Sequence, residues 1–142
     1  FIGNRKPSYD ILSEQLKNIN KNKSETINAL HKVKELTLEM YTALRKNDLN
    51  LFQDILKQSW IEKKKYVSGI TNPKIDAIIK KGFSLGAGAM KVTGAGGGGH
   101  LYMYAEKSKH KRIIRNMSKI GIQNIDFTFT KDGAKVVDVG DI

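Results

Sequence analysis

The sequence predicts an α+β fold in which a four-stranded antiparallel sheet carries its helices on one face. Three observations support this prediction. Residues 1–83 repeat apolar positions at steps of three and four, which is typical of amphipathic helices. Residues 84–142 hold short apolar or alternating segments, a glycine-rich loop and a hairpin signal. Helices followed by strands, rather than alternating with them, favour an α+β fold in a single domain of 142 residues.

Three amphipathic helices are expected before residue 68. Ser8, Ser24 and the pair Asn47–Asp48 are placed to begin them. The expected apolar seams are Tyr9, Leu12, Leu16 and Ile19 in the first helix, Ile27, Leu30, Val33, Leu36 or Thr37, Met40 and Leu44 in the second, and Phe52, Ile55, Leu56, Ser59 and Trp60 in the third. Short polar breaks predict that the helices are antiparallel neighbours. Trp60 is interpreted as a packing residue rather than as a platform for a ligand.

A fourth helix is predicted after the break at residues 68–72. Asn72 suits the N-cap, and Pro73 suits the first helical position, where its missing N–H costs nothing. The expected buried stripe is Ile75, Ile78, Ile79 and Phe83. Gly82 or Gly86 would end the helix.

The remaining elements are shorter. Residues 87–92 and 101–105 are predicted as strands, and residues 108–119 as a helix that ends at Gly121. Residues 124–130 alternate strictly between apolar and polar side chains, which is typical of a half-buried strand. The run Lys131-Asp132-Gly133 is a hairpin signal that would return the chain through Val136 and Val137 as the fourth strand.

The loop between the first two strands is the most informative stretch. Its residues Gly94, Ala95, Gly96, Gly97, Gly98 and Gly99 include no side chain larger than a methyl group. Glycines between two strands indicate close approach of a ligand or of another backbone segment, and consecutive amides can hold an anion such as phosphate. A plain hairpin connection is the alternative. The loop also fits GxGxxG, but a strand rather than a helix follows it, which excludes the dinucleotide-binding motif.

The stretch Lys91-Val92-Thr93-Gly94-Ala95-Gly96-Gly97-Gly98-Gly99 resembles the third conserved motif of the GHMP small-molecule kinases. The segments Trp60-Ile61-Glu62-Lys63-Lys64 and 68–76 are similar to the heptose-phosphate kinase branch of that family, the D-glycero-D-manno-heptose 7-phosphate kinases. Residues 1–5 resemble a segment from the middle of such enzymes. The resemblance therefore covers nearly the whole chain but only the second half of a kinase, and it implies a ferredoxin-like sheet with added helices.

The resemblance implies that the whole protein is an ATP-dependent sugar kinase that uses Mg²⁺. In such kinases the main phosphate loop, the magnesium ligands and the catalytic acid lie in the first half. We therefore expect a nucleotide-binding half as partner, a sugar or sugar phosphate as substrate, no catalytic or metal-binding residue in this chain, and no activity from this chain alone. The resemblance implies that Gly94–Gly99 line the site where acceptor and γ-phosphate meet.

Four further residues near these motifs have two interpretations each. Thr93 would add a hydroxyl contact or be a plain strand residue. Arg5 would contact phosphate or be a surface arginine, and Lys91 would contact phosphate or be an ordinary lysine at a strand edge. His100 is more readily explained as a structural residue than as a catalytic one.

Composition narrows the alternatives. The formal charge is +11, but lysines are spread over every predicted helix, and only residues 107–112 with Arg115 form a dense basic cluster. A basic nucleic-acid-binding module is therefore a second hypothesis and a disfavoured one. A non-catalytic regulatory or ligand-binding domain of the same fold is a third. The chain has no cysteine, only dispersed histidines, and no apolar run long enough for a membrane span, so a cytoplasmic protein is expected, with self-association left open.

Overall fold

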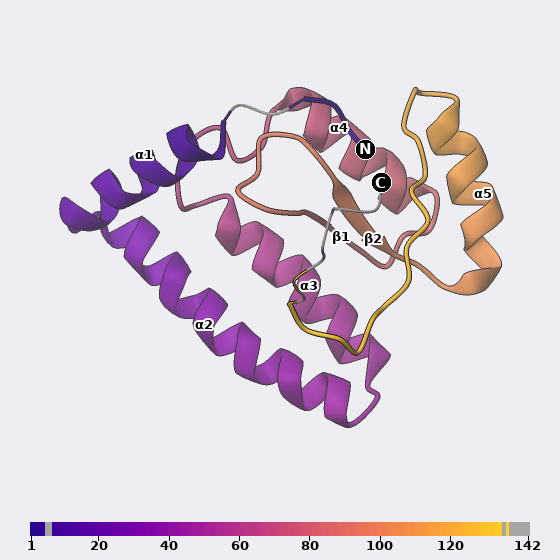
Figure 1. Cartoon of the computed structure of the whole chain (residues 1–142), viewed down its shortest axis with the longest axis horizontal. Helices are drawn as coiled ribbons and strands as arrows, with labels where there is room; N and C mark the ends of the chain where they lie inside the picture. Colours follow the sequence, from indigo (N-terminus) through magenta and orange to yellow (C-terminus); the bar gives the residue numbers. More distant parts are fainter. Residues whose placement is uncertain (5–6, 135, 137–142) are drawn as a thin grey trace.

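The computed structural model describes residues 1–4, 7–134 and 136. These residues form, in chain order, α1 (Ser8–Asn20), α2 (Ser24–Arg45), α3 (Leu49–Lys63), α4 (Pro73–Ser84), β1 (Ala89–Val92), β2 (Leu101–Tyr104) and α5 (Lys107–Ser118) (Figure 1). The predicted order, helices first and then strand, glycine loop, strand and helix, is confirmed. The α+β class is confirmed as well.

Helices α2 and α3 form an antiparallel pair, and α3 lies against β1 (Figure 1). The turns that separate the first three helices place Asn22 and Asn47 at positive φ, 51° and 52°. Asparagine tolerates this left-handed conformation better than most residues, which explains its use as a helix stop. Leu36 and Ala43 of α2 pack with Ile55 of α3 in a small cluster of their own.

Helix capping agrees with the sequence at two sites and differs at two. The side chains of Asp48 and Asn72 accept hydrogen bonds from the amides of Leu51 and Ile75, at 3.0 and 2.9 Å. Ser8 and Ser24 are the first helical residues and not caps, since Pro7 and Lys23 precede them without a capping side-chain bond. The expected caps at these two serines are therefore wrong by one position.

The apolar seams expected for the first two helices are also partly wrong. In α1 the residue that packs is Ile11, whereas Tyr9, Leu12 and Leu16 are exposed. In α2 the buried positions are Thr26, Ala29, Leu36 and Ala43. Small residues let two helices approach closely, a preference that a search for large apolar side chains overlooks. Ile78 and Ile79 of α4 are buried as expected, but Phe83 is 40% exposed.

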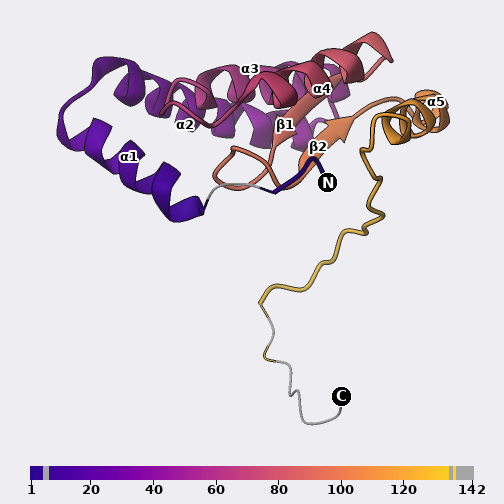
Figure 2. The ribbon, with the colours of Figure 1, turned by 90° about the horizontal axis from the view of Figure 1, so that it is seen from above.

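The four-stranded sheet is not confirmed. The described residues form a two-stranded antiparallel sheet, in which Ala89 pairs with Tyr104 and Val92 with Leu101. Residues 122–130 belong to no strand. Ile122 still packs against the core and the carbonyl of Gln123 bonds to Phe1, and the chain then runs away from the body of the molecule (Figure 2). Phe127 and Phe129 are 64% and 88% exposed. Alternation specifies which face of a strand is apolar, but a strand also needs a partner edge, and this segment forms no ladder. The predicted return strand lies partly outside the described residues, which include Val136 but not Val137.

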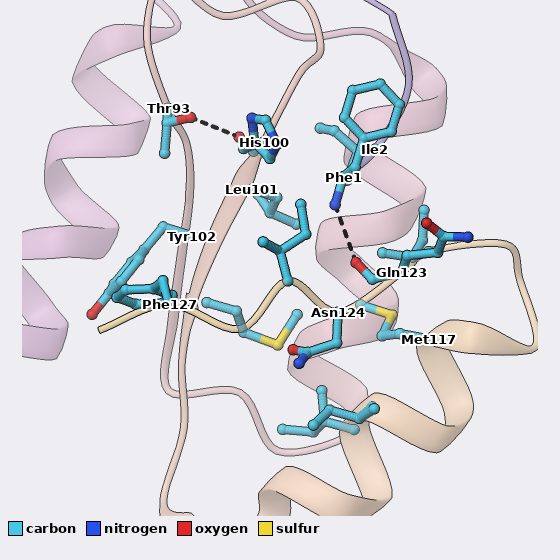
Figure 3. A pocket seen from close by; sticks show the side chains of 15 residues that line it. Phe1, Ile2, Thr93, His100, Leu101, Tyr102, Met117, Gln123, Asn124 and Phe127 are labelled. Carbon is cyan, nitrogen blue, oxygen red and sulfur yellow. Dashed lines mark hydrogen bonds between the residues drawn. The ribbon is translucent and has the colours of Figure 1, made fainter. Parts of the chain in front are cut away.

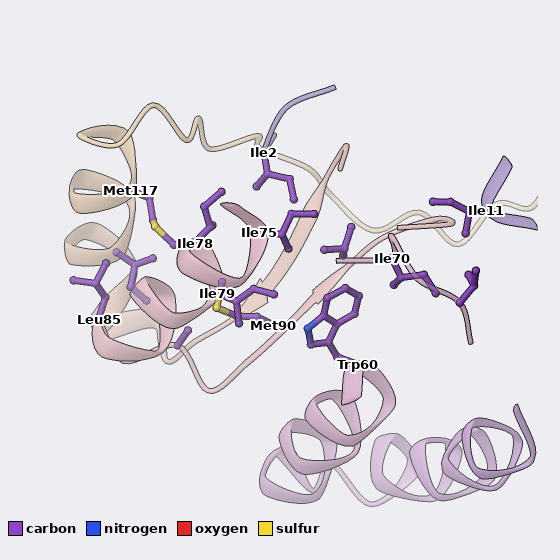
Figure 4. Packing of buried hydrophobic residues seen from close by; sticks show 14 residues of the cluster. Ile2, Ile11, Trp60, Ile70, Ile75, Ile78, Ile79, Leu85, Met90 and Met117 are labelled. Carbon is purple, nitrogen blue, oxygen red and sulfur yellow. The ribbon is translucent and has the colours of Figure 1, made fainter. Parts of the chain in front are cut away.

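The main core lies between α3, α4, the sheet and α5 (Figure 4). Trp60 from the end of α3 is 5% exposed and belongs to this core, which confirms its interpretation as a packing residue. The side chain of Met90 is fully buried against Gly82 of α4, where a Cβ atom would stand 2.4 Å from its sulfur. The core thus fixes β1, and with it the start of the glycine loop.

Candidate functional site

The glycine loop is closed at its base by the two strands. Thr93 donates to the carbonyl oxygen of His100 both from its amide, at 2.9 Å, and from its hydroxyl, at 3.1 Å. These bonds extend the β1–β2 ladder by one pair and hold the two ends of the loop together.

Two other segments hold the far part of the loop. The amide of Gly97 donates to the carbonyl of Ile70 at 2.8 Å. Gly99 forms an antiparallel bridge with Gly3, and its amide donates to the Gly3 carbonyl at 2.8 Å while its carbonyl accepts from Ile2 at 2.9 Å. The loop is therefore anchored to the break before α4 and to the first residues of the chain, and it is not a solvated linker.

Close packing explains why glycine is needed at two of these positions. A Cβ atom on Gly96, which has φ +112°, would stand 3.0 Å from the carbonyl oxygen of Ile70 and 3.1 Å from its Cα. A Cβ atom on Gly97 would stand 3.1 Å from the carbonyl oxygen of Gly69 and 3.2 Å from Cδ1 of Ile11. Of the close approaches that the sequence predicted, that of another backbone segment is observed, on one side of the loop.

The other loop amides have no such partner. No described residue accepts a hydrogen bond from the amides of Gly94, Ala95, Gly96 or Gly98. Gly94, Gly96, Gly97, Gly98 and Gly99 all have positive φ, which only glycine adopts without strain. Amide groups that lack internal acceptors in a glycine-rich loop are the chemistry of an anion site.

Two lysines lie beside the start of the loop. The Nζ of Lys63, the last residue of α3, donates a hydrogen bond to the carbonyl oxygen of Gly94. The Nζ of Lys91, in β1, donates to the hydroxyl oxygen of Ser59 at 2.7 Å. Burial, and secondly the charge of Lys91, lower the pKa of Lys63 to about 8. Burial also lowers the pKa of Lys91.

The pairing of the strands explains which way these side chains face. Lys91 is opposite Tyr102, and Ala89 is opposite Tyr104, so the four residues share one face of the sheet. This face looks toward α3, where Phe52 meets Tyr104 edge to face with ring centroids 5.3 Å apart. A pocket of about 720 Å³ opens on this side. It is lined by Leu44, Leu49, Phe52, Leu56, Lys63, Lys91, Val92, Thr93, Gly94, Tyr102, Tyr104 and Phe129.

A second pocket, of about 400 Å³, lies along the free edge of β2 (Figure 3). Apolar side chains such as Leu101 and Met117 line most of it, and the carbonyl of Gln123 accepts from the backbone nitrogen of Phe1 at 3.1 Å. His100 lies at its rim with its ring edge to face against Phe1. That contact agrees with the structural interpretation of His100.

The structure brings most of the predicted site residues together. Lys91, Thr93 and the loop lie in one place, whereas Arg5 is outside the described residues. Lys63 and Ser59 were not predicted as site residues, although Phe52, Leu56, Ser59 and Lys63 follow one another at helical steps of four and three. The signal that would have identified Lys63 is the continuation of this stripe by one helical step beyond Ser59.

The basic residues of α5 have structural contacts of their own. A Cβ atom on Gly86 would stand 2.9 Å from Cδ of Lys109, so the stem of this lysine packs on the α4–β1 connection, and its Nζ lies 3.5 Å from Glu106. Arg112 donates to the carbonyl of Ser84 at 3.4 Å. These contacts give part of the basic cluster a role that requires no nucleic acid.

Neither a metal cluster nor a membrane-spanning helix is found in the part of the chain that the structure describes. No three histidine or acidic side chains gather there, so these residues do not fit a Mg²⁺ site, and we assign the ion no ligand among them. None of the described helices combines the length and the apolar character that crossing a bilayer requires.

Comparison with known proteins gives concordant results. The family model for the C-terminal region of GHMP kinases matches residues 40–123. The D-glycero-alpha-D-manno-heptose 7-phosphate kinase of Campylobacter jejuni is 31% identical over 111 residues, which are 78% of this chain and 33% of that protein. The L-fucokinase/L-fucose-1-P guanylyltransferase of Bacteroides fragilis is 32% identical over 119 residues, 82% of this chain and 12% of that protein. The chain thus spans a third or less of the length of these two relatives, and it belongs to the GHMP kinase C-terminal family.

Proposed function

We propose that this chain is the C-terminal domain of an ATP-dependent sugar kinase, with a heptose phosphate or a similar sugar as acceptor. Its part is to present the amides of the Gly94–Gly99 loop to the phosphate groups during transfer. The observation that carries this proposal is the anchored loop, in which the amides of Gly94, Ala95, Gly96 and Gly98 have no acceptor among the described residues. The names of the two relatives, both sugar kinases, support the choice of substrate class.

The role of the loop is electrostatic positioning. Phosphoryl transfer depends mostly on holding the phosphates in line and on stabilising charge on their oxygens. Amides fixed in advance do this without reorganisation, and the loss of one such donor typically lowers kcat by about 10²–10³-fold. The anchors at Ile70 and Gly3 fix the loop in the way that this role requires.

ATP, Mg²⁺ and the acceptor's general base belong to the part of the kinase outside this chain. The described residues contain no acidic cluster for a metal, and none of the loop side chains is a proton acceptor. We therefore expect the 142-residue chain alone to be inactive as a kinase. A purified sample of this chain that phosphorylated any sugar would contradict this expectation.

The test uses the natural protein that contains this chain. ATP consumption is measured with D-glycero-D-manno-heptose 7-phosphate, L-fucose and related sugars as acceptors. Ala95→Pro removes one loop amide at a residue whose φ is not positive, and Ala95→Ser keeps it. We expect Ala95→Pro to lower kcat by about 10²-fold and Ala95→Ser to leave it within about threefold. Equal activity of the two variants, with equal thermal stability, would reject the proposed role of the loop.

A further inference from the structure

Two partly buried ammonium groups face the same pocket beside the loop. Lys63 comes from the end of α3 and Lys91 from β1, and both line the 720 Å³ pocket together with Thr93 and Gly94. They lie close enough for the charge of Lys91 to act on Lys63. The fold therefore brings two like charges to one spot, which is unfavourable unless something else compensates them.

No carboxylate compensates them within the part of the chain that the structure describes. The ion pairs found there join Lys32 to Glu35, Lys57 to Asp54, Lys65 to Glu62 and Lys109 to Glu106. Lys63 and Lys91 instead donate to neutral oxygens, the carbonyl of Gly94 and the hydroxyl of Ser59. Buried charges in proteins are usually paired, so a partner from outside this set of residues is expected.

These neutral hydrogen bonds orient the lysines without using all their donors. An ammonium group has three N–H donors, and each of these lysines uses one of them on a described residue. The carbonyl of Gly94 and the hydroxyl of Ser59 thus hold the two side chains at the pocket while the remaining donors stay available. Lys63 also ends a helix, a position that already favours a cation.

We propose that Lys63 and Lys91 together bind the phosphate group of a phosphorylated ligand in the pocket between α3 and the sheet. The assignment to phosphate rests on the proposed kinase function. A carboxylate, which has a single negative charge, would also satisfy the two ammonium charges less completely than a phosphate. Lysine is a common phosphate binder as a compact point charge. The apolar and tyrosine side chains that line the rest of the pocket would contact the non-phosphate part of the same ligand.

Binding is tested first on the 142-residue chain with inorganic phosphate as the probe. The lysine side chains are labelled for NMR, and the titration midpoint of Lys63 is followed with phosphate and with chloride at the same ionic strength. We expect phosphate to raise this midpoint, because a bound anion favours the charged form. Lys63→Gln/Lys91→Gln should weaken phosphate binding at least tenfold, while Lys57→Gln on the same helix should not change it. An unmoved midpoint, or equal binding by the double variant, would overturn the proposal.

The source of the phosphate is tested on the natural protein that contains this chain. KM is measured separately for ATP and for the sugar phosphate in the wild type and in Lys63→Gln/Lys91→Gln. A rise of at least tenfold in one of the two KM values supports the site and identifies which substrate supplies the phosphate. Unchanged KM values in an active enzyme would overturn the lysine site and leave the kinase function standing. Phosphate binding by the chain without any kinase activity of the whole protein would overturn the kinase function and leave the anion site standing.

Discussion

The side chain of Lys63 donates a hydrogen bond to the carbonyl oxygen of Gly94, and this bond ties the end of α3 to the start of the glycine loop. The two residues are 31 positions apart in the sequence. The contact exists because α3 packs on β1 and because the helical stripe through Phe52, Leu56 and Ser59 reaches Lys63. Helix, strand and loop therefore act as one unit at this site.

Gly96→Ala should destabilise the chain by about 2–4 kcal/mol, since it adds both strain at φ +112° and a clash with the backbone of Ile70. Gly69→Ala should cost roughly 1–2 kcal/mol, because Gly69 has φ +88° but open space around it. Gly133→Ala, with neither feature, should stay within about 0.5 kcal/mol of the wild type. Urea unfolding measures all three, and any other order would contradict the packing of the loop.

Ser59→Ala should lower the free energy of unfolding by about 1–3 kcal/mol. The serine is 7% exposed, and its removal leaves the Nζ of Lys91 without its hydrogen-bond acceptor at 2.7 Å. Ser118→Ala is the control, because Ser118 is exposed on α5 and bonds only within its own helix. Equal unfolding midpoints for the two variants would show that the Lys91–Ser59 bond contributes nothing.

The difference in the free energy of unfolding between Lys63→Gln and the wild type should depend on pH. The pKa of Lys63 is about 8 in the folded chain against an ordinary value of 10.5. Below pH 8 the Lys63 side chain is protonated in both the folded and the unfolded chain, so the cost of burying its charge is fully present. Between pH 8 and 10.5 the folded chain releases a proton that the unfolded chain keeps, and this cost is progressively relieved. Removing the charge should therefore stabilise the chain most below pH 8 and progressively less above it.

Urea unfolding of the wild type and of Lys63→Gln at pH 7, 8, 9 and 10 measures this difference. Lys91, Tyr102 and Tyr104 also face the pocket and are present in both proteins. Lys57→Gln controls for the loss of a lysine from the same helix. A stability difference that stays constant from pH 7 to pH 10 would contradict the lowered pKa of Lys63.

Asn72→Ala should destabilise the chain by about 1 kcal/mol, because the side chain of Asn72 caps α4 through the amide of Ile75. Ser8→Ala and Ser24→Ala should change stability by less than about 0.5 kcal/mol, since neither serine is a cap in this structure. Thermal unfolding compares the three variants. A loss of thermal stability in Ser24→Ala equal to that in Asn72→Ala would indicate that Ser24 is a helix cap.

Amides of residues 125–129 should exchange with solvent at nearly the rate of an unfolded peptide, because this segment forms no ladder in the structure. Amides bonded within the β1–β2 ladder should exchange much more slowly. Hydrogen exchange followed by NMR in the 142-residue chain compares the two sets. Protection of Phe127 and Phe129 equal to that of the ladder would indicate that the predicted further strand forms in solution.

The sequence by itself determined the elements whose signals are local. The caps at Asp48 and Asn72, the helix order, the strands on both sides of the loop and the family resemblance all depend on residues close together in the chain. Only the tertiary structure decided what depends on contacts between distant segments. Alternation at residues 124–130 did not provide a partner edge, and the seam of α1 turned out to be Ile11 because packing against the loop selects one face of the helix. The stripe through Phe52, Leu56 and Ser59 indicates the face of α3 on which Lys63 lies, but only the packing of α3 on β1 brings Lys63 to the Gly94 carbonyl.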